Sequence, residues 1–134
     1  MTGNLATVAA IYEAFGRGDV PFILDQLAEN VGWESWENNY AQKAGVPAMV
    51  PRNGKSEVLE FFKVAGGMGI KDFQVLSLME GENQVAAEIF IETSTYRDEE
   101  VHLWTFDDTG KVIRLRHYVD TAKHIAATTQ AQPA

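Results

Sequence analysis

The amino-acid sequence predicts an α+β fold in which three helices from the N-terminal half cover a curved, mixed but mainly antiparallel sheet. Apolar residues recur at helical spacing in the first half, and the alternation typical of strands dominates from residue 70 onward. The later turns, GEN, RDEE and DDTG, are short and polar, so consecutive strands are expected to pair antiparallel. A large twisted sheet curls, and the conical space under the helices is the candidate ligand site.

The length and composition indicate one globular domain over residues 1–134, with 46% hydrophobic and 22% charged residues. The net charge of −8, with no basic stripe, argues against a nucleic-acid partner. The chain has no cysteine, which excludes disulfides and thiolate chemistry. No apolar run approaches the roughly 20 residues of a membrane span, and the N-terminus lacks a signal pattern. We therefore expect no membrane partner and a cytoplasmic location.

Two short helices joined by a tight turn are expected at the N-terminus. Asn4 is expected to cap the first helix, which ends near Gly16. Pro21 falls in the first turn of the second helix, where the missing N–H of proline costs nothing. The apolar stripe of the first helix consists of Leu5, Val8, Ala9, Tyr12 and Phe15.

A third helix is expected to begin at Lys55 or Ser56 and to end at the glycine pair Gly66–Gly67. Residues 38–53 show no period and contain two prolines, so they are expected to form a loop over the mouth of the pocket. The apolar face of the third helix consists of Val58, Leu59, Phe61, Phe62 and Ala65.

Strands are expected over residues 31–37, 70–79 and 84–96, around His102, and from Lys111 onward. Arg97–Glu100 is interpreted as a solvated, charged hairpin tip. Asp120 is expected to cap a last helical turn. Alternation in the last strand places one histidine on an otherwise apolar face, which consists of Ile113, Leu115, His117 and Val119.

Five motifs, in order YEAFGRGD, ENVGWE, NGKSEVLEFF, DDTGKVIRLRHY and YVDTAKHI, resemble the nuclear transport factor 2-like superfamily and, within it, the SnoaL-like group. The resemblance implies a cone-shaped, cystatin-like barrel and a homodimer packed through the convex faces of the sheets. This fold hosts isomerases, hydrolases, cyclases and proteins without chemistry, so the resemblance points to a fold more strongly than to an activity.

The catalytic residues of two such enzymes have no counterpart in this sequence. Alignment with ketosteroid isomerase places Ile11, Ser35 and His102 where that enzyme has its tyrosine, its base and its second acid. Alignment with limonene epoxide hydrolase places His117 where that enzyme has a catalytic aspartate. Its other two catalytic positions, an arginine and an aspartate, are occupied here by Ile89 and Ile91. The resemblance nevertheless implies that His117 lies in the part of the pocket where related enzymes carry reactive groups.

His117 is the best candidate for a general acid or base, because an imidazole with a pKa near 6.5 exchanges protons near neutrality. The alternative is a core histidine bonded to a backbone carbonyl or water. His102, on the neighbouring strand, or Tyr12 is expected to donate a hydrogen bond to developing negative charge. With only these two histidines considered as ligands, no metal site and no cofactor are expected.

The remaining candidates are expected to line the ligand pocket. Ser35 could bond a ligand oxygen, and Glu37, which has pocket parity, is the reserve carboxylate. The residues expected to form a flat apolar pocket are Tyr12, Phe15, Trp33, Phe62, Met68 and Trp104. The sequence thus predicts an isomerase, cyclase or hydrolase acting on a small hydrophobic carbonyl, epoxide or polyketide-like compound. A non-catalytic protein that binds such a compound is the alternative.

Overall fold

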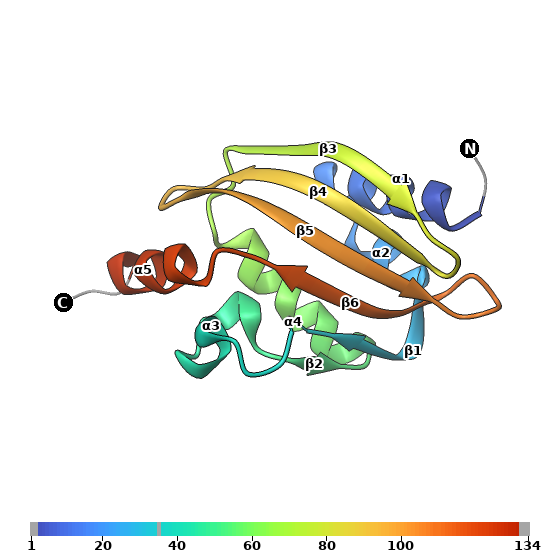
Figure 1. The fold of residues 1–134 in the computed structure, drawn as a ribbon, viewed down its shortest axis with the longest axis horizontal. Helices are drawn as coiled ribbons and strands as arrows, with labels where there is room; N and C mark the ends of the chain where they lie inside the picture. The colour runs from blue at the N-terminus through green and yellow to red at the C-terminus, as the bar shows by residue number, and fades with distance from the viewer. Residues whose placement is uncertain (1–2, 35, 132–134) are drawn as a thin grey trace.

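The computed structural model describes residues 3–34 and 36–131 and contains one mixed sheet (Figure 1). The strand order is β2-β1-β6-β5-β4-β3, and every neighbouring pair is antiparallel except β1 with β6, which is parallel. This confirms the predicted mixed, mainly antiparallel sheet. The strands are β1 (Leu27–Trp33), β2 (Arg52–Asn53), β3 (Asp72–Glu80), β4 (Gln84–Glu92), β5 (Arg97–Phe106) and β6 (Val112–Tyr118).

Three helices pack on one face of this sheet, as predicted: α1, α2 and α4 lie behind the strands in Figure 1. The C-terminal helix α5 extends from the end of β6 and contacts α3. The helices are α1 (Gly3–Gly16), α2 (Val20–Asp25), α3 (Tyr40–Lys43), the 3₁₀ turn η1 (Pro47–Met49), α4 (Lys55–Gly66) and α5 (Thr121–Ala131). None of the helices in the described part of the chain is long and apolar enough to span a membrane.

Most helix ends follow the predicted signals. Asp19 caps α2 by accepting a hydrogen bond from the backbone N–H of Phe22 at 3.2 Å, and Pro21 lies in the first turn. Helix α4 starts after Gly54, whose φ of 84° lies in the region that favours glycine. The prediction for Asn4 was wrong, because α1 already begins at Gly3 and Asn4 lies inside its first turn.

The segment predicted as a loop, residues 38–53, instead holds α3, η1 and β2. These elements are too short to show a periodic pattern in the sequence, and hydrogen bonds from side chains to the backbone hold them in place. The side chain of Asn39 accepts a hydrogen bond from the backbone N–H of Gln42 at 3.0 Å. The guanidinium of Arg52 donates to the carbonyls of Pro47 at 2.9 Å and Val50 at 3.1 Å. The segment is therefore a folded wall that brings Met49 to the pocket.

Two strand boundaries differ from the prediction in ways that affect the site. Strand β1 ends at Trp33 rather than at residue 37. Strand β4 ends at Glu92, and the turn falls at Thr93–Tyr96, where the Thr93 N–H donates to the Tyr96 carbonyl at 2.8 Å. Arg97–Glu100 therefore belongs to β5 and is not a hairpin tip. Strand alternation then buries two acidic side chains, those of Asp98 and Glu100.

Two residues expected on buried faces are exposed. A register shift between β5 and β6 pairs Phe106 with Val112 and Thr105 with Arg114. This bulge turns Val112 inward and leaves Ile113 37% exposed, although the sequence placed Ile113 on the face of His117. Leu59 of α4 is 39% exposed for a simpler reason, since it lies at the margin of the apolar face of that helix.

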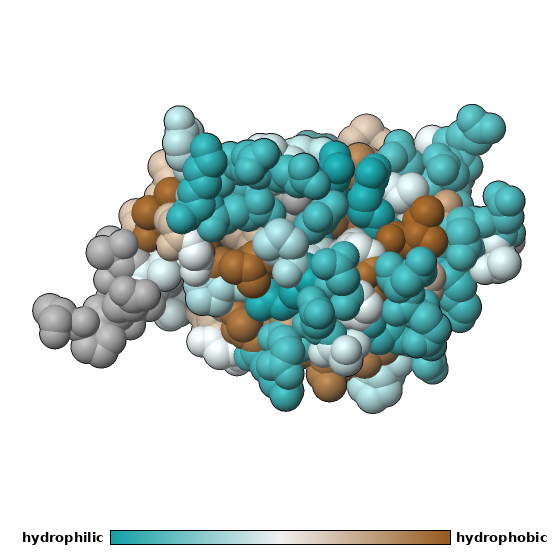
Figure 2. All heavy atoms as spheres, turned by 90° about the horizontal axis from the view of Figure 1, so that it is seen from below, coloured by the Kyte–Doolittle hydropathy of each residue, from teal (hydrophilic) through white to brown (hydrophobic). Residues whose placement is uncertain are grey.

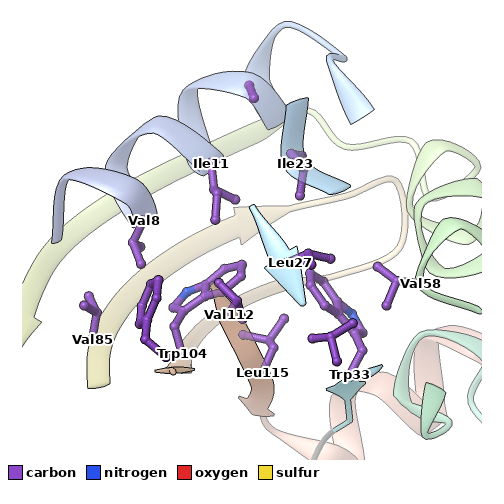
Figure 3. Packing of buried hydrophobic residues seen from close by; sticks show 13 residues of the cluster. Val8, Ile11, Ile23, Leu27, Trp33, Val58, Val85, Trp104, Val112 and Leu115 are labelled. Carbon is purple, nitrogen blue, oxygen red and sulfur yellow. The ribbon is translucent and has the colours of Figure 1, made fainter. Parts of the chain in front are cut away.

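The core lies between the three helices and the inner face of the sheet (Figure 3). Val8 and Ile11 of α1 and Ile23 of α2 point toward Trp104 and Leu115, which rise from β5 and β6. Each such side chain contributes about 1.5–3 kcal/mol by leaving water. The same packing holds both tryptophans, Trp33 and Trp104, against the pocket described next.

Candidate functional site

A cavity of about 80 Å³ lies between α1, α4 and the inner face of the sheet. Its wall contains all but two of the predicted site residues: Tyr12, Phe15, Trp33, Phe62, Met68, His102, Trp104 and His117. Glu37 is exposed and does not line the cavity, because β1 has ended at Trp33 and strand parity no longer applies. Ser35 lies outside the described residues. Most of the wall is apolar, and its polar groups gather on β5, β6 and α5.

A chain of hydrogen bonds runs from the core into these polar groups. The indole N–H of Trp104 donates to the hydroxyl of Tyr12 at 3.0 Å, and this hydroxyl lies 2.8 Å from Nδ1 of His102. Because the Tyr12 oxygen already accepts from Trp104, its hydrogen is free to point to His102 Nδ1. His102 then carries its proton on Nε2 and donates it to Oε1 of Glu100 at 3.0 Å.

Glu100 also receives a hydrogen bond from the opposite side. Nε2 of His124 lies 3.1 Å from Oε2 of Glu100 and 3.7 Å from Oδ2 of Asp98. Burial alone would raise the pKa of the Glu100 carboxyl, but the hydrogen bonds and charges of His102 and His124 outweigh burial and hold this pKa well below its usual range. Glu100 is therefore an anion that orients two imidazoles.

Strand and helix geometry explain how these groups meet. Asp98, Glu100, His102 and Trp104 alternate along β5 and all face inward. Asp120 caps α5, as predicted, by accepting a hydrogen bond from the Lys123 N–H at 3.2 Å, and the resulting helix is longer than the single turn expected. Its first turn carries His124 onto β5. The site thus includes a third histidine and two acids that were not among the predicted site residues.

His117 faces His102 across the β5–β6 pair, with the two rings 4.7 Å apart. Its ring stacks on Phe61 at 5.4 Å, and none of the hydrogen bonds found among the described residues involves it. Burial, followed by the charge of His102, lowers the pKa of His117 from 6.5 to about 3. The expectation of a group that titrates near neutrality is thus replaced by a neutral imidazole with one donor and one acceptor available to a ligand.

Trp33 adds a second polar group without a partner. Its side chain is 3% exposed, packs on Phe61, Phe62 and Trp104, and lines the cavity. Its indole nitrogen is buried and bonds no atom of the described residues. A buried donor left in this state costs about 1–3 kcal/mol, which a ligand oxygen could recover. The cavity therefore combines an apolar wall with a free donor and a free imidazole.

Several solved structures with this fold are described as NTF2-like proteins. The sequence model of the SnoaL-like domain matches residues 8–120. The chain therefore belongs to the SnoaL-like domain family. A comparison with curated proteins found no match.

Solved structures support the same fold. An NTF2-like protein of unknown function from Burkholderia pseudomallei superimposes with a TM-score of 0.77 at 24% identity, covering 96% of this chain and 99% of that one. TerC, co-crystallised with polyporic acid, gives 0.71 at 20% identity, with 90% and 94% covered. A Kribbella flavida protein described provisionally as a ketosteroid isomerase gives 0.68 at 15% identity, with 87% and 77% covered.

Proposed function

We propose that the chain binds a small hydrophobic carbonyl, epoxide or polyketide-like compound in this cavity and isomerises, cyclises or hydrolyses it by proton transfer. The observation that carries the proposal is the neutral, unbonded imidazole of His117 beside the Tyr12–His102–Glu100 chain, in a cavity that is otherwise apolar. Proton transfer by a positioned side chain is the chemistry that such a site supports.

Each of these side chains has a different role in the proposed proton transfer. His117 accepts the proton, since its depressed pKa keeps its lone pair free before the reaction. Negative charge that develops on the ligand favours the imidazolium and raises the pKa of His117 as the proton moves. A hydrogen bond from Tyr12 or His102 to that charge requires the donor to exchange its present acceptor, His102 Nδ1 or Glu100 Oε1, for the ligand. Trp33 and Trp104 exclude water.

The size of the cavity and two relatives support the choice of ligand. A space of about 80 Å³ exceeds the roughly 10–15 Å³ needed for one water but suits only a small compound. TerC was crystallised with polyporic acid, and the Kribbella flavida protein is described provisionally as an isomerase of ketosteroids. These statements concern those proteins and support a ring-bearing carbonyl compound here as a proposal.

Deuterium exchange into 2-cyclohexen-1-one, followed by NMR in D₂O, tests the proposal because it reports proton transfer next to a carbonyl. The wild-type protein is expected to accelerate exchange, and His117→Ala is expected to lose about 10²–10⁴-fold of that rate. The matched control is Glu99→Gln, an exposed side chain on the outer face of β5, which should exchange like the wild type. Equal rates for His117→Ala and the wild type would remove His117 from the mechanism.

A non-catalytic ligand-binding protein is the second candidate. The observation that favours it is the apolar character of Ile11, Ile89 and Ile91, which are buried at positions where related enzymes carry catalytic groups. In that case 2-cyclohexen-1-one should quench the fluorescence of Trp33 and Trp104 without any acceleration of deuterium exchange. The same titration separates the two functions, since an enzyme shows both signals.

The cytoplasmic location stays a prediction. We also propose that two copies of the chain form a homodimer through the outer faces of their sheets. Met79, Ala86 and Leu103 form one row across β3, β4 and β5, next to Val101, which is 37% exposed. Light scattering after size exclusion should give twice the chain mass for the wild type and the chain mass for Val101→Glu. A monomeric wild type would contradict the proposal.

A further inference from the structure

Two acids and one histidine meet at the wall of the cavity, and the proposed function uses only one of them, Glu100, as part of the hydrogen-bond chain. Asp98 and Glu100 occupy alternate positions of β5, and His124 comes from α5. One oxygen or nitrogen atom from each lies within 4.8 Å of the others, and all three residues are buried, with exposures of 5–7%. The three side chains thus converge from two elements on one point.

The distances suit a small divalent cation. Zinc binds nitrogen and oxygen ligands at about 2.0–2.2 Å in tetrahedral geometry, so two such ligands lie roughly 3.3–3.6 Å apart. Nε2 of His124 is 3.1 Å from Oε2 of Glu100 and 3.7 Å from Oδ2 of Asp98. Both separations are close to the expected value, and all three donor atoms lie within 4.8 Å of one another, so the two carboxylates need to approach by at most about 1.3 Å to bind an ion between them.

A fourth polar side chain, that of Tyr96, packs against this cluster. Its hydroxyl is buried and bonds no atom of the described residues, while its ring lies 4.7 Å from that of His124. A buried hydroxyl without a partner, on a ring that packs against the imidazole of the proposed nitrogen ligand, is suited to complete the coordination of a cation, directly or through water.

The charge of the cluster leads in the same direction. Asp98 and Glu100 carry two buried negative charges, which His102, His124 and the backbone N–H groups of Glu99 and Asp120 stabilise by hydrogen bonds. The lysine ammonium that pairs with Asp98, Nζ of Lys123, lies 3.6 Å away on a side chain that is 49% exposed, so solvent weakens its effect. A divalent cation cancels both charges at once, with His124 binding through a neutral imidazole.

We propose that Oδ2 of Asp98, Oε2 of Glu100 and Nε2 of His124 bind a divalent cation of the zinc type, which joins α5 to β5. Two carboxylates and an imidazole form a donor set that zinc accepts. Oε1 of Glu100 keeps its hydrogen bond to His102, so the ion leaves the Tyr12–His102 side of the chain in place. The proposal goes beyond the proposed function and does not depend on it.

Calorimetric titration of metal-free, untagged protein with ZnCl₂ at pH 7.5 tests the site. The wild type is expected to bind one equivalent, and its thermal midpoint should rise with zinc. Asp98→Asn and His124→Gln keep similar volumes and should weaken binding at least tenfold, since even outer partners of a metal change affinity by about 10–100-fold. Glu99→Gln, one residue from each acid but on the outer face, should bind like the wild type.

A wild type that binds no zinc up to 1 mM would overturn the proposal and leave a hydrogen-bonded cluster only. Zinc binding that is unchanged in both variants would overturn it as well. If a variant fails to fold, Co²⁺ added to the wild type still decides: intense visible bands of a low-coordinate ion support the site, and a spectrum of hydrated Co²⁺ rejects it. Loss of zinc binding leaves the exchange test with His117→Ala unaffected, so the two proposals fail separately.

Discussion

Replacement of Glu100 by alanine is expected to lower the free energy of unfolding by about 3–5 kcal/mol, because it removes one partner from a buried, charge-assisted cluster. The variant leaves Nε2 of His102 and Nε2 of His124 without their common acceptor, in a region where both residues are less than 10% exposed. Urea denaturation at pH 7.5 in the presence of EDTA measures this loss without a contribution from metal.

Glu100→Gln and Glu99→Gln are the matched variants for this experiment. Glu100→Gln retains the volume and one acceptor oxygen, so its loss should be smaller than that of Glu100→Ala. Glu99→Gln changes an exposed carboxylate on the same strand and should stay within about 0.5 kcal/mol of the wild type. A loss of less than about 1 kcal/mol for Glu100→Ala would show that the cluster does not hold β5 to α5.

The sign of the pH effect on Glu100 follows from its depressed pKa. A carboxyl whose folded pKa lies below the unfolded value of 4.5 contributes stability above pH 4.5 and loses it as the pH falls toward the folded value. The difference in stability between wild type and Glu100→Gln should therefore begin to shrink near pH 4.5 and shrink further as the pH falls. At neutral pH it should be constant.

His117→Phe is expected to weaken the acid sensitivity of the fold. The unfolded imidazole binds a proton near pH 6.5, whereas the folded one does so only near its pKa of about 3. Between these values the unfolded state holds more protons, so stability falls as the pH falls, by at most about 1.4 kcal/mol per pH unit. Between pH 6.5 and 4.5 the wild type should lose up to about 2.7 kcal/mol more than His117→Phe.

Urea denaturation at pH 7.0, 5.5 and 4.5 measures this difference. The control is Phe61→Leu, which alters packing against the same ring but removes no titrating group, so its curve should run parallel to that of the wild type. Parallel curves for His117→Phe and the wild type would mean that His117 is protonated at similar pH in the folded and unfolded states. The lowered pKa of His117 would then be wrong.

The fold and the pairing of His102 with His117 followed from local signals, because strand parity and short turns are properties of neighbouring residues. The burial of Asp98 and Glu100 was not predicted, because their charge suggested a surface position. Charge dominated the interpretation of Arg97–Glu100, although the inward alternation of Trp104 and His102 continues backward through Glu100 and Asp98. Continuing the two-residue alternation from His102 to Glu100 and Asp98 would have predicted that both acidic side chains face inward.

The other differences arise from contacts that no local pattern contains. His124 reaches Glu100 only because the first turn of α5 lies against the beginning of β5, 24 residues away in sequence. Ile113 turned outward because of a bulge that depends on how β6 pairs with β5. Glu37 was assigned by extending strand parity past Trp33, where the strand had already ended.

The parallel pairing of β1 with β6 sets an order of events during synthesis. Residues 27–33 can pair with β2 once residues 52–53 have left the ribosome, but their parallel pairing with β6 must wait for residues 112–118. At about 5–20 residues per second, this delay lasts several seconds. Throughout that time the apolar side of β1, including Trp33, is exposed to chaperones and to other nascent chains, whereas β3, β4 and β5 can already assemble as a meander.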